Sequence, residues 1–189
     1  MTSTADQILD CAQTLLVDGG YNAFSYADIA AVVGIRKASI HHHFPAKADL
    51  VRTLVARYRG QAAAGLAGIA ASVPDPLDQL RTYVGYWSAC IADARPSYCI
   101  CVMLAGELPS LPDPVAAEVR AHFRALAQWL AAAMARGAET GRIRLTDPVE
   151  TEAEAFVAAV HGAMLSARAH GDPALFGRIT APLLQRLAA

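Results

Sequence analysis

A stretch of the sequence without acidic residues carries the side chains best suited to contacting a polyanion. Between Ile29 and Lys47 there is no Asp or Glu, whereas Arg36, Lys37 and Lys47 are cationic and histidines occupy positions 41–43. Cationic side chains gathered on one face are the electrostatic footprint needed to approach phosphates. Consecutive helical residues point about 100° apart, so the three histidines do not converge on one ion. The stretch predicts phosphate contacts and no metal site.

The four cysteines are the second set of reactive side chains: Cys11, Cys90, Cys99 and Cys101. No pair has CxxC spacing and the N-terminus lacks the pattern of a signal peptide, so we expect reduced thiols and a cytoplasmic location. Two residues apart on a helix, the sulfurs of Cys99 and Cys101 would point about 200° apart, which disfavours a disulfide between them. We interpret these thiols as small buried apolar groups. A redox or electrophile sensor is the alternative.

Motif inventory and composition exclude several classes of protein. The sequence has no glycine-rich phosphate loop, no HExxH and no GxSxG, so we predict no enzyme activity and no cofactor. Hydrophobic residues make up 54% of the 189 residues, yet no uncharged apolar stretch is long enough to span a membrane. The net charge is −1, so any binding to nucleic acid must use a local patch.

Sequence signals for helix starts and ends predict the elements that carry these side chains. Asp-Pro occurs at 75–76, 113–114, 147–148 and 172–173, each before an apolar run of helical period. Asp suits the N-cap of a helix and Pro suits its first position. With the glycine and proline breaks, the pattern predicts an all-α protein of about nine helices and no strand. The expected ranges are 4–18, 25–32, 37–43, 46–71, 76–93, 98–107, 114–139, 148–169 and 173–187.

Residues 25–44 fit a helix-turn-helix position by position. Ala30 is the small residue needed where the two helices cross, and Gly34, four places later, suits the left-handed geometry of the turn. Apolar residues flank the turn and recur in the second helix, as this pair requires: they are Ile29, Val33, Ile35 and Ile40. A glycine turn between any two amphipathic helices imitates this pattern, which is the competing interpretation.

The first 50 residues resemble the tetracycline-repressor (TetR) family of bacterial transcription regulators. The resemblance lies in residues 25–30 (SYADIA), 34–37 (GIRK) and 42–50 (HHFPAKADL). It implies a homodimer whose second motif helices enter successive major grooves of a palindromic DNA operator. Carried over by position, the implied DNA-binding residues are Ser25, Arg36, Lys37, Ser39, His41, His42 and Lys47. Family members often carry Tyr where this chain has His41, so whether His41 contacts a base or a phosphate is open.

Two further sets of residues lie in the C-terminal part. The resemblance implies that the middle helices enclose a ligand pocket, and aromatic residues with a few polar groups are typical of such sites. The candidates are Tyr83, Trp87, Cys90, Met103, Glu107, His122, Phe123 and Trp129, and their composition suggests a mostly apolar or aromatic effector. Small and apolar residues of the last two helices predict a dimer interface. Its candidates are Phe156, Ala159, Val160, Ala163, Ala167, Leu175, Ile179 and Leu183.

These observations predict a ligand-responsive, sequence-specific DNA-binding regulator in two functional domains. Residues 1–46 form the helix-turn-helix DNA-binding domain, and residues 47–189 form the effector-binding and dimerisation domain. The predicted partners are double-stranded DNA, a small-molecule effector and a second copy of the chain, with no membrane. A repressor is favoured over an activator. The alternative function is a helical ligand-binding or thiol-sensing adaptor that keeps the helix-turn-helix fold without binding an operator.

Overall fold

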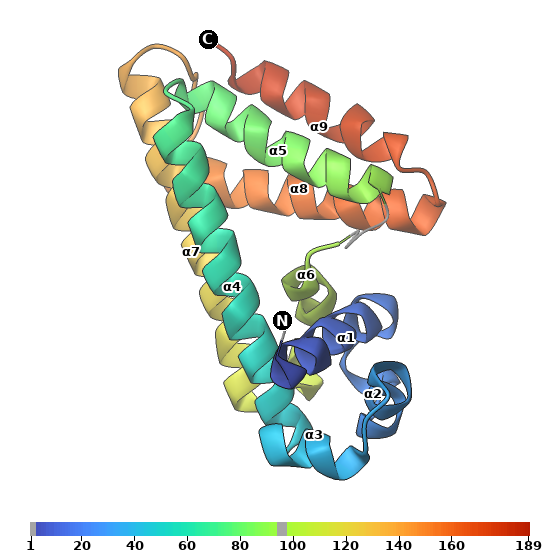
Figure 1. Ribbon diagram of the computed structural model, residues 1–189. Helices are drawn as coiled ribbons and strands as arrows, with labels where there is room; N and C mark the ends of the chain where they lie inside the picture. The colour runs from blue at the N-terminus through green and yellow to red at the C-terminus, as the bar shows by residue number, and fades with distance from the viewer. Residues whose placement is uncertain (1–2, 94–97) are drawn as a thin grey trace. The chain divides into compact units, whose positions relative to one another are not determined.

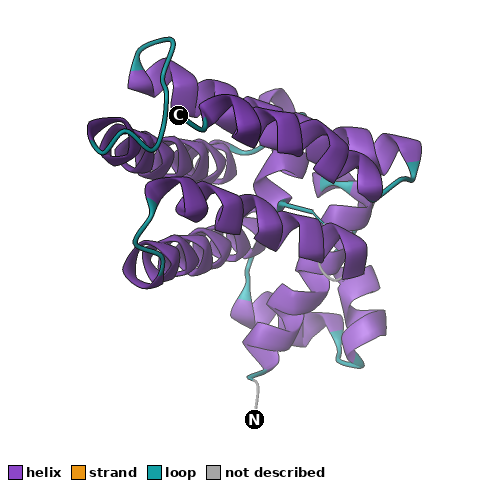
Figure 2. Ribbon diagram, turned by 90° about the horizontal axis from the view of Figure 1, so that it is seen from above, coloured by secondary structure: helices purple, strands orange, loops and turns teal. Residues whose placement is uncertain are grey.

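The computed structural model describes residues 3–93 and 98–189, and within them every long element is an α-helix (Figures 1 and 2). The helices are α1 (Thr4–Gly19), α2 (Tyr26–Val33), α3 (Lys37–His43), α4 (Lys47–Ser72), α5 (Pro76–Asp93), α6 (Ile100–Ala105), α7 (Asp113–Glu139), α8 (Val149–His170) and α9 (Ala174–Leu187). Short 3₁₀ helices cover Tyr21–Ala23 and Leu108–Ser110. None of the described helices is long and apolar enough to cross a membrane.

The predicted all-α architecture is confirmed, and most helix ends lie within one residue of the expected positions. The largest difference is at α6, which begins at Ile100 and ends at Ala105 rather than covering 98–107. Cys99 is the N-cap of this helix, with extended backbone angles (φ −65°, ψ 120°), and therefore lies outside it. The assumption that Cys99 and Cys101 share one helix is wrong.

The chain folds as two compact units. The first comprises residues 1–61 and 99–122, and the second comprises residues 62–98 and 123–189. The boundary between them falls inside α4 and inside α7. These units are defined by packing, whereas the division predicted after residue 46 is a division of function and stays a prediction.

In the first unit, α1 packs against α2, α3 and α6. The largest fully buried side chains here are aliphatic, and each comes from an apolar position repeated at helical spacing. They are Ile8, Leu16, Ile29, Ile40, Leu50, Leu54, Ile100 and Leu104. Ile29 and Ile40, predicted to hold the helix-turn-helix pair together, are both completely buried.

In the second unit, α9 packs against both α8 and α5, and the three helices run side by side in Figure 1. Phe156 of α8 and Phe176 of α9 are the largest fully buried side chains. Pro182 lies inside α9 without ending it. The buried face of α8 contains Phe156, Val160, Ala163 and Ala167, so this face is occupied by the chain's own core.

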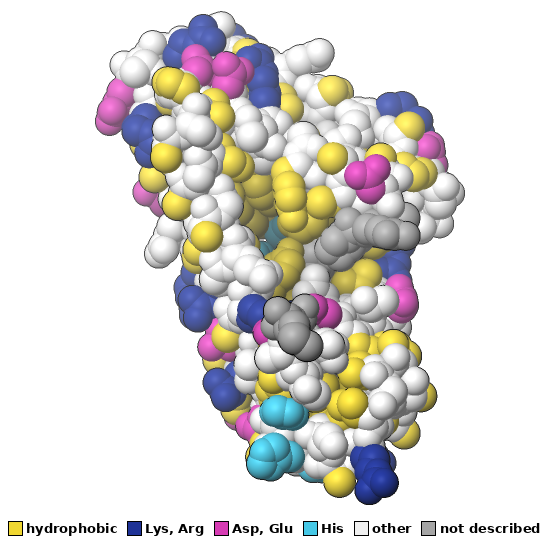
Figure 3. All heavy atoms as spheres, viewed as in Figure 1, with side chains coloured by type: hydrophobic (Ala, Val, Ile, Leu, Met, Phe, Trp, Pro, Cys, Tyr) yellow, Lys and Arg dark blue, Asp and Glu magenta, His cyan; other side chains and the backbone are white. Residues whose placement is uncertain are grey.

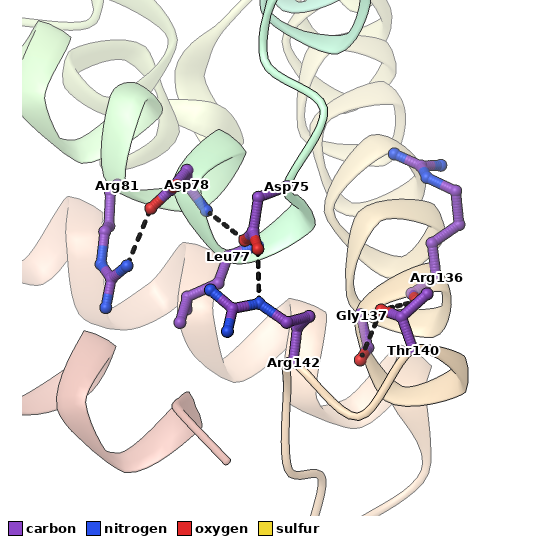
Figure 4. Close-up of polar contacts among 8 residues, drawn as sticks. All are labelled: Asp75, Leu77, Asp78, Arg81, Arg136, Gly137, Thr140 and Arg142. Atoms are coloured by element: carbon purple, nitrogen blue, oxygen red, sulfur yellow. Dashed lines mark hydrogen bonds and ion pairs between the residues drawn. The ribbon is translucent and has the colours of Figure 1, made fainter.

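The start of α5 shows how an Asp-Pro pair works in this chain (Figure 4). Asp75 Oδ1 accepts hydrogen bonds from the backbone N–H groups of Leu77 (2.9 Å) and Asp78 (3.1 Å). Its other carboxylate oxygen accepts a hydrogen bond from the guanidinium of Arg142, which follows α7. Burial acts to raise the pKa of Asp75, but Arg142 and the two N–H groups outweigh it and lower the pKa below its usual value.

We expect Asp75→Ala to lower the free energy of unfolding at neutral pH, and this loss to shrink in acid. Because the pKa of Asp75 is lower in the folded chain, its stabilising effect is complete above about pH 3.9 and is lost as pH falls through the folded value. Urea unfolding of both proteins at pH 7 and pH 3 measures the difference. Asp113→Ala, at the start of α7, controls for loss of any acidic group near a helix N-terminus. An equal loss at both pH values would contradict this role of the carboxylate.

Candidate functional site: a helix-turn-helix and an aromatic cluster

Local backbone chemistry fixes the helix-turn-helix. The Ser25 hydroxyl oxygen accepts a hydrogen bond from the N–H of Ala27 (3.2 Å), and the N–H of Ser25 donates to the Asp28 carboxylate (2.7 Å). This pair forms a capping box that starts α2. Gly34 ends α2 in the left-handed region (φ 76°, ψ 31°), where a side chain would be strained. The chain then turns within three residues and starts α3 at Lys37.

One face of α3 is buried and the other is exposed. Ile40 is completely buried, and Phe44 immediately after the helix is buried as well. Lys37, Ala38, His41 and His42 are exposed at positions i, i+1, i+4 and i+5, which share one side of a helix. Histidine and cationic side chains gather over the α3 end in the space-filling view (Figure 3). Ser39 is half-buried, while Ser25 and Arg36 are exposed.

His41 is exposed but also contacts other residues of the first unit. Its ring meets the Tyr26 ring edge-on, with centroids 4.8 Å apart, and its Nδ1 lies 3.3 Å from the Pro45 carbonyl oxygen. The Tyr26 hydroxyl donates to the Phe44 carbonyl oxygen (2.8 Å), and burial raises the pKa of this phenol to about 12. These contacts tie the end of α3 to the start of α2.

Lys47, for which the resemblance implies a phosphate contact, is half-buried and contacts other residues of the first unit. Its ammonium donates to the Phe24 carbonyl oxygen and lies 4.2 Å from the Phe24 ring centroid and 4.9 Å from that of Tyr21. Burial lowers the pKa of this half-buried amine, with Glu107 and Asp28 acting in the opposite direction. These contacts hold Lys47 against the segment between α1 and α2, and its role as a phosphate contact stays a prediction.

The second unit contains an aromatic cluster. Tyr83 and Trp87 lie one turn apart on α5 and are buried, and the Tyr83 ring centroid is 6.2 Å from that of Trp129 on α7. The indole N–H groups of Trp87 and Trp129 are buried without a hydrogen-bond partner among the described residues. Buried N–H groups without a hydrogen-bond partner are rare in proteins, because burying such a group without a hydrogen bond costs folding free energy. A ligand atom that accepts a hydrogen bond would satisfy them.

His161, which the sequence analysis missed, contacts the predicted ligand residue Phe123 of the same unit. It is buried on α8, and its ring meets that of Phe123 edge-on with centroids 5.3 Å apart. A histidine within an alanine-rich helix is the only signal that the sequence offers for it. Cys90, another predicted ligand contact, is half-buried on α5.

Three predicted pocket residues belong to the first unit instead. Met103 and Glu107 lie on and just after α6, and His122 lies on α7. The Glu107 carboxylate accepts a hydrogen bond from the N–H of Tyr21 (2.9 Å), so it contacts the segment after α1. The other five candidates, Tyr83, Trp87, Cys90, Phe123 and Trp129, belong to the second unit together with His161, and the role of all eight as effector contacts stays a prediction.

Cys99, Cys101 and His122 come together in the first unit. All three are buried, and their sulfur and imidazole nitrogen atoms lie within 4.8 Å of one another. Cys99 Sγ is 3.7 Å from His122 Nε2. Burial, followed by the contact with Cys99, raises the pKa of the Cys101 thiol well above its usual value, while Arg59 acts in the opposite direction. Arg59 itself pairs with Glu118 (3.0 Å).

The predicted dimer residues have different surroundings. Phe156, Val160, Ala163 and Ala167 are buried within the chain's own core, so the interface proposed below uses other residues, and an interface role for these four stays a prediction. Ala159, Leu175 and Leu183 are half-buried, and Ile179 is 37% exposed. The outer face of α8 instead presents Ala155, Ala158, Gly162 and Leu165.

A capped helix, a left-handed glycine turn and a short helix with an exposed cationic and imidazole face define a helix-turn-helix DNA-binding regulator. The sequence profile of bacterial regulatory proteins of the tetR family matches residues 8–54, and that of the tetracyclin repressor-like C-terminal domain matches residues 76–183. The chain belongs to the TetR family of transcriptional regulators. This membership confirms the resemblance to the TetR family found in the sequence, and the expectation that the chain is a regulator and not an enzyme.

Solved structures agree with this membership. A TetR-family transcriptional regulator from Agrobacterium tumefaciens is 59% identical, covers 98% of this chain and 97% of its own, and superposes with a TM-score of 0.96. A TetR transcriptional regulator from Legionella pneumophila is 25% identical over 99% and 98% of the two chains, with a TM-score of 0.87. A regulator from Saccharomonospora viridis in complex with choline has the same fold (18% identity, 98% and 97% coverage, TM-score 0.84). No curated protein sequence matches the chain.

Proposed function

We propose that this TetR-family chain is a repressor that binds a palindromic operator as a homodimer and is released by a small, mostly apolar or aromatic effector. The observation that carries the proposal is the exposed face of α3, where Lys37, His41 and His42 stand together in a stretch without acidic residues. Ser25 and Arg36, both exposed, flank this face and supply a hydroxyl and a guanidinium for the phosphate backbone.

Selection of bound duplexes from a random DNA pool at about 0.1–0.15 M salt tests operator binding, since affinity for DNA depends steeply on salt. We expect one palindrome to be enriched, because a closed two-fold dimer presents two copies of α3. A folded protein that enriches no sequence contradicts the proposal and favours the adaptor. Transcription from a promoter carrying the selected site then distinguishes a repressor from an activator.

The outer face of α8 supports the proposed dimer. Ala158 and Gly162 are small and exposed, and Leu165 on the same side is 43% exposed. Ile179 of the adjacent α9 adds apolar surface at 37% exposure. Small side chains let helices from two chains approach closely, and exposed aliphatic groups supply area whose burial stabilises the contact.

We therefore expect Leu165→Glu to produce a folded monomer. A carboxylate at this position would have to be buried without a partner on association, which costs several kcal/mol. Light scattering should report half the wild-type mass, circular dichroism should be unchanged, and palindrome binding should be lost. Val32→Glu, the same kind of apolar-to-acid change at an exposed position of α2, is the control and should remain dimeric. A dimeric Leu165→Glu protein would move the interface elsewhere.

The aromatic cluster supports an apolar effector with a hydrogen-bond acceptor. Trp87 and Trp129 are the only tryptophans of the chain, so intrinsic fluorescence reports on this cluster alone. The choline complex of the Saccharomonospora viridis regulator shows that the fold admits a small molecule in that protein. Here the rings and indole donors favour an aromatic ligand carrying a carbonyl or carboxylate.

A panel of benzoate and aryl ketone derivatives should contain compounds that quench the tryptophan fluorescence and raise the melting temperature. For such a compound, Trp129→Phe should weaken binding by about 2–10-fold, because it keeps a ring and removes one hydrogen-bond donor. Tyr86→Phe, at an exposed position of α5, should leave the affinity unchanged. If no compound of the panel shifts the melting temperature, an effector of this class is contradicted.

A further inference from the structure

We propose that Cys99, Cys101 and His122 bind one Zn²⁺ ion and leave its fourth coordination position open. Two sulfurs and one imidazole nitrogen, all buried, lie within 4.8 Å of one another in the first unit. Sulfur and imidazole are the donors that Zn²⁺ prefers, and three protein ligands with one open position is an established zinc arrangement.

Local structure explains why these three groups meet. The extended backbone at Cys99 places its thiol outside α6, whereas Cys101 is the second residue of that helix. This break in helical geometry removes the 200° separation expected if both were helical. His122 comes from α7 and brings its Nε2 to 3.7 Å from Cys99 Sγ. The fold itself thus brings together one ligand from α6, one from the residue that precedes α6, and one from α7.

The spacing fits the ion. Zinc–sulfur and zinc–nitrogen bonds of about 2.3 and 2.0–2.1 Å at tetrahedral angles place sulfur and nitrogen about 3.6 Å apart. Cys99 Sγ and His122 Nε2 are 3.7 Å apart. Without an ion, Cys99 and His122 hold each other by a hydrogen bond, and Zn²⁺ would replace the proton between them, because metal ligands must be deprotonated. The other two pairs lie within 4.8 Å, so side-chain movements of at most about 1 Å bring all three atoms to tetrahedral spacing.

Charge and ligand type favour Zn²⁺ over monovalent soft ions and over hard divalent ions. Two thiolates and one divalent ion sum to zero, which suits a buried site because an uncompensated charge there is costly. A monovalent soft ion would leave one negative charge, and the hard ions Mg²⁺ and Ca²⁺ prefer oxygen ligands. The nearby Arg59 and Glu118 pair with each other at 3.0 Å, so together they add no net charge.

Cobalt substitution tests the site directly on the reduced full chain, after removal of metal with a chelator. Titrated Co²⁺ should give thiolate-to-cobalt charge-transfer bands and the visible bands of a tetrahedral ion, saturating at one ion per chain. Added Zn²⁺ should abolish these bands. Absence of the thiolate bands, or binding of Zn²⁺ that X-ray absorption shows to have no sulfur ligands, would overturn the proposal.

Variants locate the ion. Zn²⁺ binding should weaken by at least about 100-fold in each of the variants Cys99→Ala, Cys101→Ala and His122→Phe. Substituting a residue that only hydrogen-bonds to a metal ligand already lowers metal affinity 10–100-fold. The matched controls, Cys11→Ala and Cys90→Ala, alter half-buried cysteines outside the cluster and should bind as wild type does. Equal affinity in Cys101→Ala and Cys11→Ala would overturn the assignment. The spectra and X-ray absorption of the unaltered chain decide the question if a variant does not fold.

Discussion

Phe156→Ala is expected to lower the free energy of unfolding by about 3–5 kcal/mol. Phe156 is only 1% exposed and is one of the two largest fully buried side chains of the described residues. Removing its ring takes away apolar burial and leaves a cavity that the surrounding helices fill only in part. Urea unfolding monitored by circular dichroism, at several protein concentrations, measures the loss.

The same variant distinguishes a core residue from an interface residue. Substitution of a core residue lowers the free energy of unfolding of the chain itself. Substitution of an interface residue shifts only the concentration at which the dimer dissociates. Val32→Ala, at a position that is 70% exposed, is the control and should lie within about 0.5 kcal/mol of wild type. If Phe156→Ala unfolds like wild type but is monomeric, Phe156 belongs to the interface after all.

Lys37→Glu is expected to weaken operator binding by at least about 100-fold, because placing like charges together at an interface costs several kcal/mol. Lys37 is the first residue of α3, is exposed, and lies on the face shared with His41 and His42. No acidic residue between Ile29 and Lys47 offsets its charge. The milder Lys37→Ala should reduce the slope of log affinity against log salt by about one if Lys37 contacts a phosphate.

The control for charge is Arg124→Glu, which also lowers the net charge by two, at an exposed position of α7. It should bind the operator within a few fold of wild type, since Arg124 lies outside the helix-turn-helix and salt screens exposed charges that contact no phosphate. Fluorescence anisotropy with the selected duplex, at several salt concentrations, measures all three variants. Equal losses for Lys37→Glu and Arg124→Glu would mean that net charge, and not α3, governs binding.

The helices could be predicted because their signals are local. Asp75 with Pro76, the Ser25 capping box and Gly34 act through bonds to residues two to four positions away. The helix-turn-helix face could also be predicted, because Ile40 and Lys37 differ sharply in hydrophobicity.

Side-chain placements that depend on contacts far along the chain could not be predicted. In α8, alanines lie on the buried face (Ala163, Ala167) and on the exposed face (Ala155, Ala158), so composition does not identify the core side. The cluster of Cys99 with His122 depends on α7 returning to α6, and the bond from Tyr21 to Glu107 joins residues 86 positions apart.

The two lysines of the chain differ in a way that matters for handling the protein. Lys37 and Lys47 are its only lysines, and the amine of Lys47 is held against Phe24 and Tyr21. An acylating reagent therefore finds one open side-chain amine, on α3. Amine coupling to a sensor chip or bead would tether the protein through this helix and hide it from DNA. Attachment through an added tag keeps this helix free, and we expect acylation of Lys37 to weaken operator binding.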